Sequence, residues 1–140
     1  MTSFEPVIIG FFCQWCAYAA ADAAGRARKA LPADLRVVRV MCSGRVDPGF
    51  VLQAFAGGAD GVLIVGCLAG NCHYITGNNE ALKRVVLLKA VLDPLGIDAA
   101  RVHMAGIGAE DPAGLAGIVI QFAEKIRYLG PLALSLGHQC

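Results

Sequence analysis

Short apolar segments rich in β-branched residues alternate four times with helical segments along this chain of 140 residues. Two of them, PVIIGFFC at residues 6–13 and GVLIVG at residues 61–66, are apolar throughout, which is typical of strands buried on both faces of a sheet. Two further strands are predicted over residues 35–41 and 101–107. Strands that alternate with helices form a parallel sheet with helices on both faces.

The helical segments have recognisable ends. Asp47-Pro48 and Asp111-Pro112 combine an N-cap residue with a proline in the first turn. The helices are predicted over residues 17–31, 47–55, 82–95 and 111–129. We therefore predict a single α/β domain of the flavodoxin-like or Rossmann-like class, with a four-stranded parallel sheet in the order 2-1-3-4. This domain covers residues 1–130, and residues 131–140 form an apolar tail that we expect to dock on a partner.

The composition limits the kinds of partner. Hydrophobic residues make up 56% and charged residues 16% of the chain, against about 45–50% and 25% in ordinary soluble domains. This surplus of apolar residues predicts a protein interface. The net charge of +1, without a basic stripe, argues against nucleic acid or an anionic membrane as a partner.

Neither a membrane span nor a signal peptide is predicted. Every apolar run is interrupted well before the roughly 20 residues that a transmembrane helix needs. The N-terminus has no basic region ahead of its first apolar run. We therefore expect a cytoplasmic protein without direct membrane insertion.

Six cysteines are many for a reducing compartment, where structural disulfides are rare. Five of them end a predicted strand or lie in the loop that follows one: Cys13, Cys16, Cys42, Cys67 and Cys72. Because parallel strands all end at the same edge of a sheet, these five are predicted to meet there, where such sheets place their functional residues. Cys140, in the tail, is not expected to be a ligand.

Thiolates gathered in this way suit zinc or an iron–sulfur cluster. Structural zinc is usual in small domains that lack a core, and this chain is long enough to have one. A third possibility is a thioredoxin-type dithiol made by Cys13 and Cys16. The dithiol hypothesis leaves Cys42, Cys67 and Cys72 without a role. An iron–sulfur protein, a zinc-stabilised scaffold and a thiol–disulfide oxidoreductase all remain as hypotheses.

Three segments contain the five cysteines that follow predicted strands: FFCQWCAYAAAD, RVMCSGRVDPGFVLQAFAGGADGVLIVGC and GNCHYITGNNEA. Together they resemble the delta subunit of the methyl-viologen-reducing hydrogenase. The resemblance runs from about residue 7 to residue 130. It implies a non-catalytic electron-transfer subunit of anaerobic metabolism that carries one 2Fe–2S cluster. It also implies two partners: a hydrogenase or formate dehydrogenase subunit, and a flavin-containing heterodisulfide reductase subunit of the A type.

A 2Fe–2S cluster takes four protein ligands, so one of the five cysteines is spare. In the order 2-1-3-4 the first and third strands are neighbours whose connections leave on opposite faces, which creates a crevice between them. Cys13 and Cys16 would line one side of the crevice, and Cys67 and Cys72 the other. Cys42 lies one strand away and is predicted to be spare. Adjacent strands are only about 4.8 Å apart, so a set in which Cys42 replaces Cys16 is the alternative.

Overall fold

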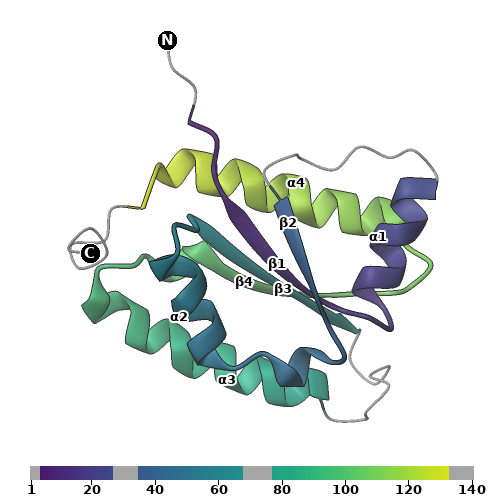
Figure 1. The fold of residues 1–140 in the computed structure, drawn as a ribbon, viewed down its shortest axis with the longest axis horizontal. Helices are drawn as coiled ribbons and strands as arrows, with labels where there is room; N and C mark the ends of the chain where they lie inside the picture. Colours follow the sequence, from purple (N-terminus) through teal and green to yellow (C-terminus); the bar gives the residue numbers. More distant parts are fainter. Residues whose placement is uncertain (1–3, 27–34, 68–76, 133–140) are drawn as a thin grey trace.

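The computed structural model describes residues 4–26, 35–67 and 77–132 (Figure 1). Its strands are β1 (Ile8–Cys13), β2 (Leu35–Val40), β3 (Gly61–Cys67) and β4 (Val102–Ile107). Its α-helices are α1 (Ala17–Arg26), α2 (Pro48–Ala56), α3 (Gly77–Leu92) and α4 (Pro112–Leu129). Three short 3-10 helices connect them: η1 (Ser43–Arg45), η2 (Asp93–Leu95) and η3 (Ala99–Arg101).

All the strand pairs are parallel, and the sheet has the order β2-β1-β3-β4. The predicted fold class and strand order are both confirmed. The two central strands pair in register, with Ile8 opposite Gly61 and Phe12 opposite Val65. Cys13 is opposite Val40 at the end of β2. The carboxyl ends of β1, β2 and β3 therefore meet at one edge of the sheet.

Consecutive residues of the central strands face opposite sides, so each side carries its own core. Phe12, Leu63 and Val65 pack with the buried residues of α1 and α4. Phe11, Val62 and Ile64 pack with the buried residues of α2 and α3. Figure 1 shows the two pairs of helices on opposite faces of the sheet. The connections that follow β1 and β3 thus leave on opposite faces, as predicted.

The boundaries of two elements differ from the predictions. Helix α3 begins at Gly77, five residues before the predicted start, because its first turn is polar and gives no apolar periodicity. The predicted helix 17–31 is described only as far as Arg26. Both Asp-Pro starts are confirmed: Asp47 Oδ1 accepts from the Gly49 N–H at 2.7 Å, and Asp111 Oδ1 accepts from the Gly114 N–H at 2.9 Å.

Strand β2 is exposed along most of its length. Its four central residues are all exposed, including both Val37 and Val38. A parallel sheet is usually covered on both faces, so this edge strand departs from the expectation of buried strands. Among the helices that the structure describes, none is both long enough and apolar enough to cross a membrane.

A buried polar network closes the amino end of the sheet. Asp60, just before β3, accepts backbone N–H bonds from Val7 at 2.9 Å and Leu132 at 3.1 Å. Arg101, just before β4, donates to the carbonyls of Asp60 and Gly130, each at 2.9 Å. The side chains of Asp60 and Arg101 are buried, so these bonds satisfy groups that water does not reach. They fasten residues near both ends of the described chain to the end of the sheet opposite the cysteines.

Candidate metal centre

The cysteine edge begins with the turn between β1 and α1. Cys13 is the last residue of β1, and the N–H of Gln14 donates to the carbonyl of Val40 at 2.8 Å, which ties this turn to the end of β2. The carbonyl of Cys16 accepts from the N–H of Ala20 at 2.8 Å, so Cys16 stands at the start of α1. A helix N-terminus favours negative charge, and a ligating thiolate carries one.

Cys42 is presented by η1, the 3-10 turn after β2. Its sulfur accepts from the N–H of Gly44 at 3.4 Å, while its carbonyl accepts from the N–H of Arg45 at 2.9 Å. The guanidinium of Arg84, on α3, donates to the carbonyl of Gly44 in the same turn. The turn that carries Cys42 is thus linked to a side chain that comes from a separate helix.

Three of the five predicted thiols come together. Cys13 and Cys42 pack together with only 1% and 5% of their surface exposed, and the half-buried Cys16 packs against this pair. The thiol of Cys13 also lies 3.9 Å from the carbonyl of Met41, to which it donates. All three are thiols rather than disulfides. Soft sulfur donors in a nearly dry setting are the donor set that zinc and iron–sulfur clusters take.

Cys67 ends β3, two residues beyond Val65, the pairing partner of Phe12. Its backbone therefore reaches the same edge as Cys13. The side chain of Cys67 and all of Cys72 lie outside the described residues, as does Cys140. Within the part of the chain that the structure describes, no three His, Cys, Asp or Glu side chains lie together in an arrangement that could hold a metal ion. The described thiols are of the donor type that such a site takes, and the side chains of the other predicted ligands lie outside the described residues.

Sequence reasoning did not find Arg84, the N–H of Gly44 or the carbonyl of Met41. Arg84 is 40 residues from Gly44, and nothing in its local sequence separates it from any other exposed helical arginine. The two backbone groups belong to residues whose side chains carry no chemistry. Only the packing of α3 against η1 brings Arg84 to the cysteine edge.

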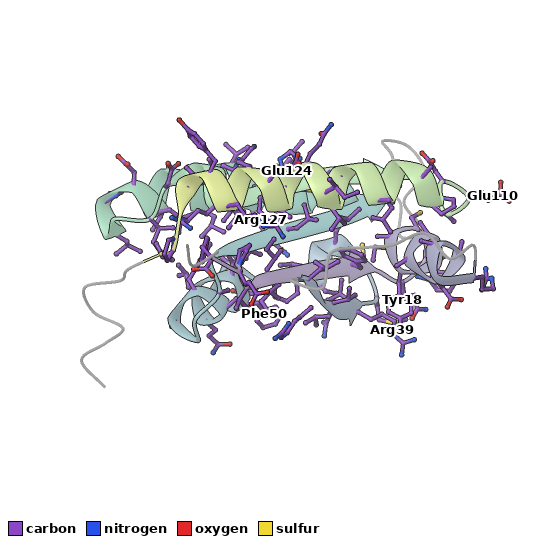
Figure 2. The ribbon with its side chains drawn as sticks, turned by 90° about the horizontal axis from the view of Figure 1, so that it is seen from above. Tyr18, Arg39, Phe50, Glu110, Glu124 and Arg127 are labelled. Carbon is purple, nitrogen blue, oxygen red and sulfur yellow. The ribbon has the colours of Figure 1, made fainter. Side chains whose placement is uncertain are left out.

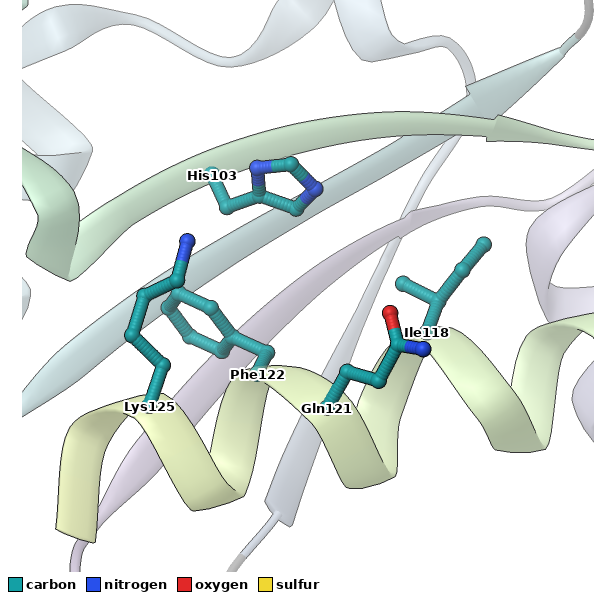
Figure 3. A pocket seen from close by; sticks show the side chains of 5 residues that line it. All are labelled: His103, Ile118, Gln121, Phe122 and Lys125. Atoms are coloured by element: carbon teal, nitrogen blue, oxygen red, sulfur yellow. The ribbon is translucent and has the colours of Figure 1, made fainter. Parts of the chain in front are cut away.

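A hollow lies away from the cysteine edge, between β4 and α4 (Figure 3). It has a volume of about 150 Å³ and is lined by His103, Ile118, Gln121, Phe122 and Lys125. The rings of His103 and Phe122 stack with their centroids 6.1 Å apart. Burial, with help from the charges of Lys125 and Lys89, lowers the pKa of His103 from its usual 6.5. No thiol lines this cavity, so it is separate from the cysteine edge.

Comparison with known proteins identifies the family to which this chain belongs. Residues 8–130 match the family described as the methyl-viologen-reducing hydrogenase delta subunit. The chain belongs to this family. The resemblance of the cysteine segments is thereby confirmed, and the match covers every described strand and helix.

Relatives of two sizes contain this domain, and the shorter ones are about as long as this chain. The D-type iron–sulfur subunit of the vhc F420-non-reducing hydrogenase of Methanococcus voltae is 45% identical over 132 residues, which is 94% of this chain and 92% of that protein. The D-type iron–sulfur subunit of the F420-non-reducing hydrogenase of Archaeoglobus profundus is 45% identical over 128 residues, 91% of this chain and 93% of that one.

A longer relative contains the same domain as one part. It is the A-type subunit of the ferredoxin/F(420)H(2)-dependent CoB-CoM heterodisulfide reductase of Methanosarcina acetivorans, 42% identical over 135 residues. The match takes in 96% of this chain and spans only 17% of the length of that relative. A domain of this kind therefore occurs both as a separate chain and inside an A-type subunit.

Proposed function

We propose that this chain is an electron-transfer subunit that carries one 2Fe–2S cluster at the carboxyl edge of its sheet. The observation that carries the proposal is the packing of Cys13, Cys16 and Cys42 at that edge, beside the end of the strand that carries Cys67. The names of the D-type relatives, which describe iron–sulfur subunits, support the kind of cofactor.

The proposed ligands are Cys13, Cys16, Cys67 and Cys72, two from each side of the crevice between β1 and β3. Cys42 is then a neighbour of the cluster rather than a ligand. The contact between Cys42 and Cys13 supports a place for Cys42 beside the cluster. The alternative ligand set, in which Cys42 replaces Cys16, is therefore also tested. The spare thiol is identified by the substitutions described in the Discussion.

Bound in this site, the cluster would supply one-electron chemistry. The protein's own residues do the rest. The sheet buries Cys13 and Cys42 away from water, which limits solvent access and so influences the potential of a bound centre. Arg84 holds the loop that carries Cys42, and the start of α1 favours negative charge at Cys16. The chain itself is expected to have no turnover.

Two partners are proposed: a heterodisulfide reductase A-type flavoprotein, and a hydrogenase or formate dehydrogenase subunit. Support comes from relatives whose names are those of D-type hydrogenase subunits and of A-type heterodisulfide reductase subunits. The surplus of apolar residues agrees with a permanent complex. We place this complex in the cytoplasm. The proposed tail, from residue 131, is described only as far as residue 132, so its docking on a partner stays a prediction.

The visible spectrum of protein purified without oxygen tests the cofactor. A brown protein with two irons and two sulfides per chain, and with absorption bands that bleach on adding dithionite, is expected. A colourless protein with stoichiometric zinc would instead support a zinc-stabilised scaffold. A colourless, metal-free protein whose Cys13 and Cys16 cycle with thioredoxin would support a thiol–disulfide oxidoreductase. Either of these last two results overturns the proposal.

A further inference from the structure

An exposed apolar patch lies directly beside the buried thiols. It consists of Trp15, Tyr18, Val37, Arg39 and Met41, from the turn after β1, from α1 and from β2 with the residue that follows it. We propose that this patch, here called the edge patch, is the docking surface for a heterodisulfide reductase subunit of the A type. The inference rests on the proposed function, and it adds the surface through which that partner is engaged.

Neighbouring segments of the chain supply the members of the edge patch, and two of these members are in direct contact. The guanidinium of Arg39 lies over the ring of Tyr18, 5.3 Å from its centroid, and Figure 2 shows these two side chains together. Val37 and Arg39 face the same side of β2, because they are two residues apart. The bond from the Gln14 N–H to the Val40 carbonyl holds the segment of Trp15 beside that of Met41.

The patch also touches the candidate centre. Trp15 lies in the chain between Cys13 and Cys16, and the carbonyl of Met41 accepts from the thiol of Cys13 at 3.9 Å. A protein that covers Trp15 and Met41 would therefore lie against residues that adjoin the thiols. Electron transfer to a partner needs such a short approach, so the place of the patch suits the proposed function.

Its side chains are of the kind that dominate binding energy at interfaces. Trp15 is 40% exposed, Tyr18 39% and Met41 49%, and Trp, Tyr and Arg are the residues most enriched at binding hot spots. Tyr18 and Arg39 are already stacked on each other, so less side-chain entropy is lost when they are covered. Strand β2 has no neighbour on its outer side within the described sheet, which leaves this edge open to a partner.

The choice of the A-type subunit comes from the longer relatives. In Methanosarcina acetivorans, and also in Methanosarcina mazei, a domain like this one makes up 17% and 16% of a heterodisulfide reductase subunit of the A type. Two modules on one chain meet at a high effective concentration, so a contact surface between them is favoured. When the modules are separate chains, the same contact must be made by docking. Among the described residues Arg39 pairs with no carboxylate, so an acidic side chain of the partner would complement it.

Binding of the purified A-type subunit to the intact, cluster-loaded chain tests the proposal. The test variants are Met41→Glu and Tyr18→Ala. Their matched controls are Leu87→Glu on α3, where Leu87 is 71% exposed, and Tyr128→Ala on α4, where Tyr128 is 90% exposed. Each test variant is expected to weaken binding by about tenfold or more, a loss typical of hot-spot residues, while the controls bind as the wild type does.

A photo-crosslinking residue placed at Tyr18, with Tyr128 as its control position, gives a second readout that does not depend on lost affinity. Crosslinking to the A-type subunit from position 18 but not from position 128 supports the edge patch. Unchanged binding in both test variants overturns it. Equal losses in test and control variants also overturn it, as does weakening confined to the hydrogenase subunit or to self-association.

Iron content and visible absorbance are measured on every sample, so that the two proposals can fail separately. If the wild-type chain contains no iron but still binds the A-type subunit through the edge patch, the proposal of a cluster is overturned and the proposal of a docking surface is supported. If the chain carries a full cluster but all its variants bind normally, the proposal of a cluster is supported and the proposal of a docking surface is overturned.

Discussion

Arg84, on α3, donates a hydrogen bond from its guanidinium to the carbonyl of Gly44, two residues after Cys42. Replacing it by Arg84→Gln removes this link between α3 and the η1 turn. Because the bond is exposed to water, its net contribution is that of an ordinary hydrogen bond, and we expect a loss of about 1 kcal/mol in the free energy of unfolding. Urea denaturation measures this loss, and hydrogen exchange at residues 43–46 should become faster.

Lys89→Gln, on the same helix, is the matched control for Arg84→Gln and is expected to leave exchange at residues 43–46 unchanged. Identical exchange in the wild type and Arg84→Gln would show that the η1 turn holds its shape without α3.

Single substitutions to alanine distinguish the roles of the five cysteines that are predicted to meet at the sheet edge. Loss of visible absorbance is expected when Cys13, Cys16, Cys67 or Cys72 is replaced, because each supplies one of the four ligands. Cys42→Ala is expected to stay coloured, with shifted bands, since it removes only a neighbour of the cluster. Cys140→Ala is the control. A colourless but folded Cys42→Ala protein, with a coloured Cys16→Ala, would establish the alternative ligand set.

Asp60 accepts N–H bonds from Val7 and Leu132 within a buried network. Asp60→Ala leaves both donors without their acceptor, so the free energy of unfolding should fall by roughly 2–4 kcal/mol. Asp60→Asn keeps one acceptor oxygen and should lose less. Asp93→Ala, at an exposed position in η2, is the control. A denaturation midpoint equal to that of the wild type in Asp60→Ala would mean that the network contributes no net stability.

His103 is expected to make the stability of the fold depend on pH. Burial beside Lys125 and Lys89 lowers its pKa from the usual 6.5, so the unfolded chain binds a proton more readily than the folded one. The free energy of unfolding is therefore expected to decrease as pH falls through 6.5 towards the lowered pKa, and to rise again on return to neutral pH. Urea denaturation at pH 7.5 and pH 5.5 should show a smaller difference for His103→Gln than for the wild type. An equal or larger difference in the variant contradicts this assignment.

Much of the fold could be predicted because the central strands are unambiguous. PVIIGFFC and GVLIVG are apolar on every residue, and the Asp-Pro pairs mark two helix starts that the caps confirm. Their order places Cys13 and Cys67 at one edge without any knowledge of side-chain packing. The start of α3 was missed because Gly77 and the polar residues after it carry no apolar period.

The exposure of β2 was missed for a different reason. LRVVRV contains enough valine to predict a strand. Its exposure, however, depends on how the helices pack over the sheet, which the strand's own sequence does not show. Local sequence patterns also do not predict the Arg84 bond or the Asp60–Arg101 network, because these bonds join residues that lie from 29 to 72 positions apart in the chain. Local patterns predict elements, whereas these contacts arise only when the elements are packed.

The Asp60–Arg101 network has a consequence for how this domain can be tethered. It holds Val7 and Leu132 at the amino end of the sheet, while the thiols lie beyond the carboxyl ends of strands of six or seven residues, about 20 Å away. A connection made at Val7 or at Leu132 therefore starts at the end of the sheet opposite Cys13 and Cys42. A connection to a larger chain at that end would leave the edge with Cys13 and Cys42 clear for the approach of a partner.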